Sequence, residues 1–243
     1  MLGRRALLSV CALMVLQAQP PATSEVDRVL DAWEARMKGL TSFTCRFRQE
    51  KKVSFMRRPL VSTGTMAFRE RRLLWRTETP APGFLAVDAT EVRIYTPEFK
   101  LLEIYPLAGA RAPGASATAG SGASPSQGAS PTWSGAFPGF TGDLAALREP
   151  YLPELRPLPA GSKEMRLRFT PRREELKKEV VHVEITLDPQ YSITTWRIVR
   201  ANGDELALSI EEFVANAKVS DADLTFDVPA DVKVVRPLAG PAK

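Results

Sequence analysis

The chain is poor in the residues that most often carry out chemistry. It has 243 residues but only one histidine and two cysteines, which excludes a histidine-rich metal site. Cys11 lies in an apolar N-terminal run, so Cys45 is the one thiol of the rest of the chain and no internal disulfide forms there. Neither a glycine-rich phosphate loop nor a G-x-S-x-G nucleophile elbow occurs. We therefore predict a protein that is not an enzyme and that uses no metal or cofactor.

The few remaining candidates for acid–base or thiol chemistry are poorly placed. His182 falls between valines on the outward side of a strand pattern and is interpreted as a surface or half-buried neutral residue. The neighbouring glutamates at 174–175 and 211–212 would face opposite ways in strands, which does not suit a catalytic pair. Cys45 alternates with two phenylalanines, and apolar surroundings do not favour the reactive thiolate.

Long hydrophobic runs are also missing, apart from one near the N-terminus. The apolar run from Ala6 to Leu16 follows two arginines and precedes small residues, which is the layout of a secretory signal peptide. It is too short to cross a hydrocarbon core of about 30 Å as a helix. We predict that residues 1–22 are a signal peptide cleaved after Ala18 or Ala22, and that residues 23–240 form a single exported, periplasmic domain.

Charge of one sign is not concentrated anywhere. The net charge is +5, and the basic residues are dispersed rather than gathered in a block with interleaved aromatics. This excludes nucleic acid as an expected partner. A weak attraction to anionic membrane surfaces or acidic partners is all that the balance implies.

The first element that the sequence predicts is an amphipathic helix over residues 24–39. Ser24 is a suitable N-cap with Asp27 as its capping-box partner, and Gly39 marks the end. Apolar residues recur at helical spacing on one face, where they are expected to pack on a sheet. These residues are Val26, Val29, Leu30, Trp33, Met37 and Leu40.

From residue 42 the pattern changes to strict alternation. In SFTCRFRQEK, Phe43, Cys45 and Phe47 point to one side and the arginines to the other. Similar short segments follow, separated by Gly, Pro and Asn-Gly-Asp turn signals. We predict about ten or eleven antiparallel strands in a highly curved sheet or partial barrel, and hence an α+β fold that is mainly β. A second short helix is expected near residues 143–148.

One segment interrupts this pattern. Residues 108–134 are rich in Ala, Gly, Ser and Pro and nearly devoid of bulky apolar groups. Such a segment buries too little surface to offset its ordering entropy, so we predict a disordered loop. Because strands of the same style resume beyond it, we do not predict a domain boundary there.

The segment FRQEKKVSFMRRPLVSTGTMAFRERRLLWRTETP resembles the LolA family, the periplasmic carriers of outer-membrane lipoproteins. The resemblance extends to the C-terminal half, in the Leu-Asp turn at 187–188, IEEFVANAKVSDADLTFDVP and DVKVV. The matching positions of the first segment are Phe47, Gln49 and Lys51 in a strand, then Arg58, Pro59, Leu60, Ser62 and Gly64 in a turn, then Leu73, Trp75 and Pro80.

The resemblance implies a fold and a function. The fold would be an incomplete, half-open antiparallel barrel with helices forming a lid over an apolar cavity that shields lipoprotein acyl chains. The partners implied are an acylated lipoprotein or other lipid ligand, an ATP-driven release complex like LolCDE in the inner membrane and a LolB-like acceptor in the outer membrane, with the carrier a monomer. The cavity would be lined by Phe43, Phe47, Leu73, Trp75, Trp33 and Met37.

The resemblance also implies a lid latch made by an arginine six residues before the tryptophan. Counting back from Trp75 gives Arg69, whereas counting forward from Gly64 gives Glu70, where the family usually has proline. Arg71 is therefore the alternative latch, and the absence of a latch is a third interpretation. Two other functions stay open: a LolA-like carrier of another acylated or isoprenoid lipid, and an adaptor that senses lipids or lipoproteins and regulates a partner.

Overall fold

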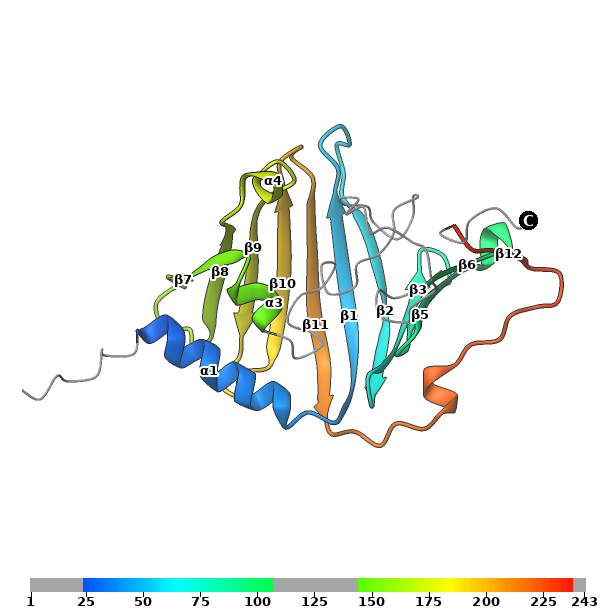
Figure 1. Cartoon of the computed structure of the whole chain (residues 1–243), viewed down its shortest axis with the longest axis horizontal. Coiled ribbons are helices and arrows are strands. Elements are labelled where there is room, and N and C mark those ends of the chain that lie inside the picture. The colour runs from blue at the N-terminus through cyan, green and yellow to red at the C-terminus, as the bar shows by residue number, and fades with distance from the viewer. Residues whose placement is uncertain (1–23, 107–143, 238–243) are drawn as a thin grey trace, which may run out of the picture.

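The computed structural model describes residues 24–106 and 144–237 (Figure 1). The predicted signal peptide and the predicted disordered loop at 108–134 lie outside the described residues. Within the described ranges, no helix is long and apolar enough to cross a membrane.

One twelve-stranded sheet dominates the structure, in the order β12-β6-β5-β4-β3-β2-β1-β11-β10-β9-β8-β7. Neighbouring strands are antiparallel, except that β12 pairs with β6 in parallel. The strands are β1 (Ser42–Lys52), β2 (Leu60–Arg69), β3 (Arg72–Thr79), β4 (Gly83–Val87), β5 (Glu91–Thr96), β6 (Leu101–Pro106), β7 (Tyr151–Arg156), β8 (Met165–Pro171), β9 (Val180–Leu187), β10 (Ile193–Arg200), β11 (Glu205–Ala215) and β12 (Lys233–Val235).

The sheet confirms the mainly β fold and corrects the strand count. In Figure 1 the strands β10, β11 and β1 run upright, whereas β5 and β6 are strongly inclined, so the sheet is twisted and curved. The strands β7 and β12 form its two separate edges. Two short edge strands raise the count above the ten or eleven predicted. Pro153 interrupts the pattern of β7, which is tolerated because an edge strand does not need every ladder hydrogen bond. The three residues of β12 are too few to show alternation.

In the described part of the chain, three α-helices accompany the sheet: α1 (Glu25–Lys38), α3 (Ala145–Arg148) and α4 (Glu174–Lys177). The Ser24 side chain caps α1 as predicted, because its Oγ accepts the backbone N–H of Asp27 at 3.1 Å. Trp33 of α1 is fully buried and lies against Phe169 of β8, with ring centroids 6.5 Å apart. The apolar stripe of the predicted helix thus packs on the sheet.

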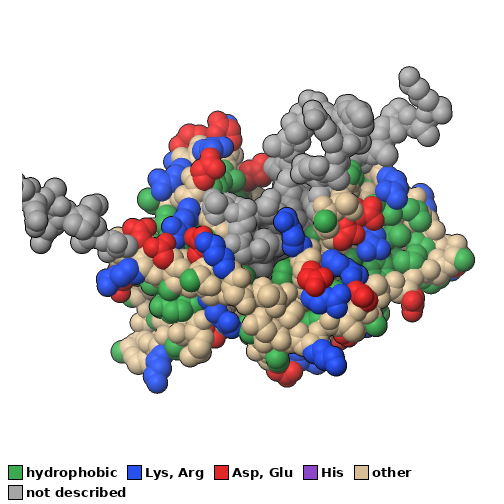
Figure 2. Space-filling view, turned by 60° about the horizontal axis from the view of Figure 1, so that its bottom comes forward, with side chains coloured by type: hydrophobic (Ala, Val, Ile, Leu, Met, Phe, Trp, Pro, Cys, Tyr) green, Lys and Arg blue, Asp and Glu red, His purple; other side chains and the backbone are tan. Residues whose placement is uncertain are grey.

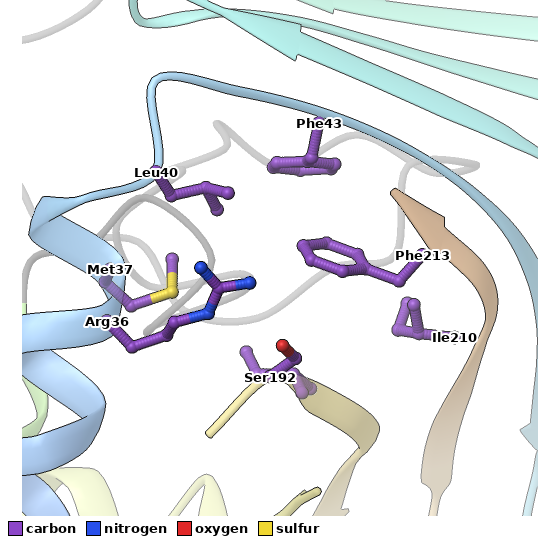
Figure 3. A pocket seen from close by; sticks show the side chains of 8 residues that line it. Arg36, Met37, Leu40, Phe43, Ser192, Ile210 and Phe213 are labelled. Carbon is purple, nitrogen blue, oxygen red and sulfur yellow. The ribbon is translucent and has the colours of Figure 1, made fainter. Parts of the chain in front are cut away.

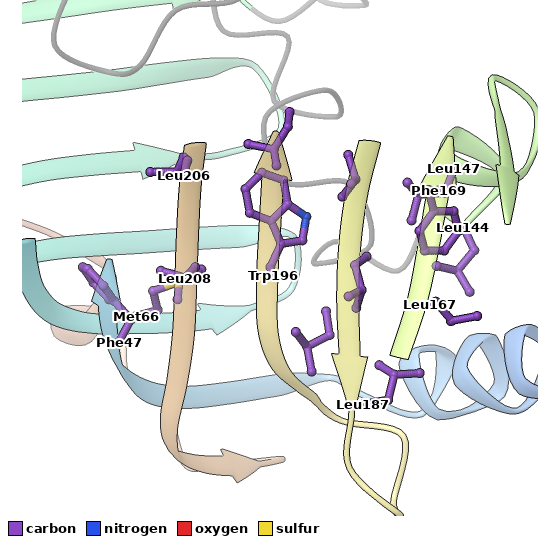
Figure 4. Packing of buried hydrophobic residues seen from close by; sticks show 14 of the residues in the cluster. Phe47, Met66, Leu144, Leu147, Leu167, Phe169, Leu187, Trp196, Leu206 and Leu208 are labelled. Atoms are coloured by element: carbon purple, nitrogen blue, oxygen red, sulfur yellow. The ribbon is translucent and has the colours of Figure 1, made fainter. Parts of the chain in front are cut away.

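The sheet has two apolar faces, which we name the helix face and the tail face. The helix face carries the large core cluster, which runs from β8 and β9 through β1 to β5 and includes the contacts of α1. Figure 4 shows part of it, from Phe47 and Met66 to Leu167 and Phe169. The tail face carries two smaller clusters, in which Val219, Leu224 and Phe226 of the C-terminal segment cover β3 to β6. Two-sided coverage explains why β4 and β6 have the sequences GFLAV and LLEIYP, which are apolar at nearly every position.

Two local predictions are wrong. The alternation that puts His182 on the outward side predicts that its neighbour Val181 faces inward, but Val181 is exposed and Val180 is buried in its place. The register with β10 shifts between Val199 and Arg200. The glutamates at 174–175 lie on the helix α4 rather than on a strand.

Candidate functional site

A row of aromatic side chains crosses four neighbouring strands, β11, β1, β2 and β3, on the helix face. The rings of Phe43 and Phe68 stack at 5.3 Å between centroids, and Phe213 of β11 approaches Phe43 at the same distance. Further along β1, the ring centroids of Phe47 and Trp75 lie 4.3 Å apart. This row is placed by the register, which sets inward-facing residues of β1, β2 and β3 opposite one another.

Gly64 makes this row possible. It lies directly opposite Phe47, and the register of β2 against β3 shifts between Thr63 and Gly64. A Cβ at this position would lie 1.9 Å from the carbonyl oxygen of Arg76 and 2.9 Å from Cε1 of Phe47. The absence of a side chain lets the backbone of β3 and the Phe47 ring close over β2, next to Trp75.

A small cavity lies between the C-terminal end of α1 and the sheet (Figure 3). Met37 and Leu40 line it from the helix side, and Phe43, Ile210 and Phe213 line it from the strands. Its volume is about 20 Å³, which is room for about one water molecule. The large enclosure implied by the LolA resemblance is therefore not formed at this place.

The predicted cavity residues fall into two groups. Phe43, Phe47, Leu73 and Trp75 come together on β1 and β3, and of these only Phe43 lines the small cavity. Met37 also lines it. Trp33 packs instead on β8, which is separated from β3 by β2, β1, β11, β10 and β9.

Sequence reasoning missed two aromatic residues of this region. Phe68 continues the alternation of Met66 along β2, so the pattern contained it. Phe213 was not recognisable, because Glu212 adopts a φ of 48° and the ladder between β1 and β11 is irregular between Thr44 and Arg46. An irregularity of this kind reverses the side that the following residues face.

Arg69, the predicted latch, is bonded to the C-terminal segment. Its guanidinium donates to the carbonyl oxygen of Val219 at 2.5 Å and to Oδ1 of Asp221 at 2.7 Å. Arg72 donates to the same carboxylate oxygen at 2.6 Å, and the two arginines lower the pKa of Asp221. These bonds lie beside the tail-face cluster that contains Val219, whereas α1 packs on the helix face.

Arg71, the alternative latch, is exposed in the tight turn between β2 and β3. Glu70 and Arg71 have φ values of 51° and 68°, as a two-residue hairpin turn of the primed type requires. Proline cannot adopt a positive φ, which explains why Glu70 stands where the LolA family usually has proline. In the described chain neither arginine is bonded to α1 or α3. A lid latch stays a prediction. For Arg69 to bond to a helical lid, its bonds to Asp221 would first have to break.

The titratable groups of the described chain do not form a catalytic arrangement. Burial raises the pKa of the Cys45 thiol to about 12, which keeps it protonated. Burial also lowers the pKa of His182, helped by the charge of Arg168. Although burial opposes it, the hydrogen bond and charge of Arg168 lower the pKa of Glu184, which accepts from that guanidinium at 2.7 Å. No group of three metal-ligating side chains occurs among the described residues.

Charged side chains of both signs are interspersed over the surface seen in Figure 2. This agrees with the dispersed charge of the sequence. The large core cluster of the helix face is apolar, and Arg36 and Ser192 add polar groups at the small cavity.

Comparison with known proteins gives similarity at the level of structure. No protein-family model and no curated protein matches the chain. An uncharacterized conserved protein from Thermus thermophilus aligns over 88% of this chain and 99% of its own, with a TM-score of 0.51 and 14% identity. The fold is shared with that protein.

Solved structures that are similar to this chain include a LolA superfamily protein from Nitrosomonas europaea. It covers 83% of this chain and 97% of its own, with a TM-score of 0.38 and 10% identity. The lipoprotein LppX from Mycobacterium tuberculosis covers 79% of this chain and 97% of its own, with a TM-score of 0.36 and 10% identity.

Proposed function

We propose that this protein binds the acyl chains of a lipid or lipoprotein on the helix face and carries them through an aqueous compartment. The observation that supports the proposal best is the apolar helix face itself, which continues across most of the sheet and includes the aromatic row at Phe43, Phe47 and Trp75. Three residues of the LolA-like pattern support the same face: the rings of Phe47 and Trp75 lie 4.3 Å apart between centroids, and Gly64 lies opposite Phe47.

The physical requirement for such a carrier is a large apolar surface without directional bonds. Each methylene removed from water contributes about 0.8 kcal/mol, so a lipid with several chains needs an extended face rather than a polar pocket. Burial of this kind is non-directional and accepts fluid chains of varied length. The helix face supports the proposal because its side chains are aromatic and aliphatic, so the contacts that it can offer are of this kind.

The face must open before an acyl chain enters, because the cavity at the end of α1 holds only about 20 Å³. The two ends of α1 differ in burial. Leu30 and Trp33 are buried completely, whereas Met37 and Leu40 are only partly buried. In our proposal α1 stays anchored through Trp33, and its C-terminal end moves away from Phe43 and Phe213 to admit the chain.

The cellular route follows the LolA resemblance and forms part of the same proposal. The signal peptide directs the protein to the periplasm. There it receives acyl chains from an ATP-driven release complex in the inner membrane and delivers them to an acceptor in the outer membrane. The protein needs no cofactor and no enzymatic step for this transfer.

The first experiment identifies the cargo. The protein is purified from the cell envelope without detergent, and extracted ligands are analysed by mass spectrometry. We expect an acylated or isoprenoid molecule in stoichiometric amount. A ligand-free protein that also fails to keep a triacylated lipoprotein in solution would contradict the proposal.

The second experiment tests the face. Leu73 lies on β3, partly buried against the core cluster, so Leu73→Glu places a charge on the helix face at tolerable cost to folding. We expect at least about tenfold weaker binding of a fluorescent fatty acid, because burying an unpaired carboxylate is strongly unfavourable. Val181→Glu is the matched control, since Val181 is an exposed strand valine. Equal binding by both variants would remove β3 from the site.

A further inference from the structure

The connection between β1 and β2 ends in an exposed apolar tip. We define the basic tip as residues 54–58, with the sequence SFMRR. Phe55 is 86% exposed and Met56 is 38% exposed, although both are large apolar side chains. Figure 1 shows this connection at the upper end of the sheet, beyond the last paired residues of the two strands. The proposed carrier function makes no use of it.

Basic side chains accompany the exposed apolar ones. Arg57 and Arg58 are both exposed, and within residues 24–106 and 144–237 neither forms an ion pair. The nearby acidic residues are already engaged. Asp204 accepts the backbone N–H of Ser54 at 2.9 Å, and Glu205 accepts from Arg197 at 2.5 Å. The tip therefore presents two free guanidinium groups next to an exposed phenyl ring.

The tip is held in a defined shape. The backbone N–H of Met56 donates to the carbonyl oxygen of Val53 at 2.8 Å, and Val53 itself is buried. Together with the bond from Ser54 to Asp204, this turn fixes the backbone on both sides of Phe55. The phenyl ring is thus held away from the core cluster by the fold.

We propose that the basic tip docks the protein on an anionic membrane surface. Phe55 and Met56 enter the interface between headgroups and acyl chains, and Arg57 and Arg58 bind lipid phosphates. Arginine suits this role because its planar fork matches phosphate oxygens and its stem tolerates apolar surroundings. Two apolar side chains on a narrow turn fit shallow insertion into a bilayer, and two unpaired positive charges are complementary to anionic headgroups.

This inference goes beyond the proposed function, because docking needs no cargo. It is tested by flotation of the ligand-free protein with vesicles of equal parts phosphatidylglycerol and phosphatidylcholine, compared with vesicles of phosphatidylcholine alone. We expect binding to the anionic vesicles that weakens as salt is raised. Equal, weak binding to both vesicle types would overturn the inference while leaving the carrier proposal intact.

Matched variants distinguish binding through the basic tip from nonspecific binding of the protein to vesicles. Phe55→Ser is expected to bind anionic vesicles about tenfold more weakly, since it loses most of the buried apolar area. Phe99→Ser is the control, because Phe99 is also 70% exposed but lies between β5 and β6. Arg57→Gln is expected to weaken binding about fivefold, and Arg71→Gln, in the β2–β3 turn, is its control. If the control variants lose as much binding as the tip variants, the tip is not the docking site.

Discussion

Gly64→Ala is the sharpest test of how the helix face is built. The added methyl group would lie 1.9 Å from the carbonyl oxygen of Arg76, well inside contact distance, and 2.9 Å from Cε1 of Phe47. The oxygen belongs to the backbone of β3, so relief requires the strand to move rather than a side chain to rotate. Overpacking usually costs about 1–3 kcal/mol, and a backbone clash belongs at the upper end, about 3 kcal/mol. For a chain of this size, that lowers the Tm by about 6–12 °C.

The control for this prediction is Gly83→Ala. A Cβ at Gly83 would find its nearest atom, Cβ of Thr77, at 3.8 Å, which is ordinary contact. Because alanine is favoured over glycine in strands by about 0.5–1 kcal/mol, we expect this variant to be neutral or slightly more stable. Urea denaturation of both variants measures the difference. A Gly64→Ala protein within about 0.5 kcal/mol of the wild type would refute the close approach of β2 and β3.

Three further predictions concern titration, the buried thiol and the arginine cluster. Burial lowers the pKa of His182 in the folded state, so below about pH 6.5 the unfolded chain binds more protons and stability falls as the pH drops. His182→Gln should reduce this loss of stability, measured by urea denaturation at about pH 7 and 5.5. A pH dependence unchanged by the substitution would be inconsistent with the burial of His182. In a Cys11→Ser variant, Cys45 should resist a thiol reagent at about pH 8 until the protein unfolds, because burial raises the pKa of the Cys45 thiol to about 12. Rapid labelling of Cys45 in the native protein would disprove its burial. Arg69→Gln should cost only about 1 kcal/mol of stability in thermal unfolding, because its carboxylate partner Asp221 is largely exposed. Fatty-acid binding should stay unchanged. Altered binding at unchanged stability would instead support the latch.

Much of the local structure is predictable from the sequence because it depends on periodicity. The helical spacing of Val29, Leu30 and Trp33 gives the buried stripe of α1, and the alternation of Phe43 and Phe47 gives the helix face of β1. In these segments each residue's side is fixed by its position in the repeat.

Features that depend on breaks in the repeat are not predictable in this way. The positive φ of Glu212 and the register shifts of β1 and β9 change which side the following residues face, so Phe213 was missed and Val181 was placed on the wrong side. The pairing of Arg69 with Asp221 joins residues far apart in the sequence. Such contacts follow from the path of the C-terminal segment over the tail face, which alternation does not encode.

The size of the cavity beside α1 was not predictable from the sequence. The LolA resemblance implies that Phe47 and Trp75 line one cavity, and in the structure their ring centroids lie 4.3 Å apart. Alternation identifies inward residues equally well in an open cavity and in a packed core. The cavity of about 20 Å³ beside Met37 and Phe43 depends on how closely α1 approaches the sheet.

The central claim, that acyl chains bind on the helix face, is tested most directly by quenching of tryptophan fluorescence with a brominated fatty acid. Trp33, Trp75 and Trp196 all belong to the core cluster of this face. We predict saturable quenching that is clearly smaller in Trp75→Phe. Fluorescence that stays constant while the fatty acid is titrated to its solubility limit would contradict the claim.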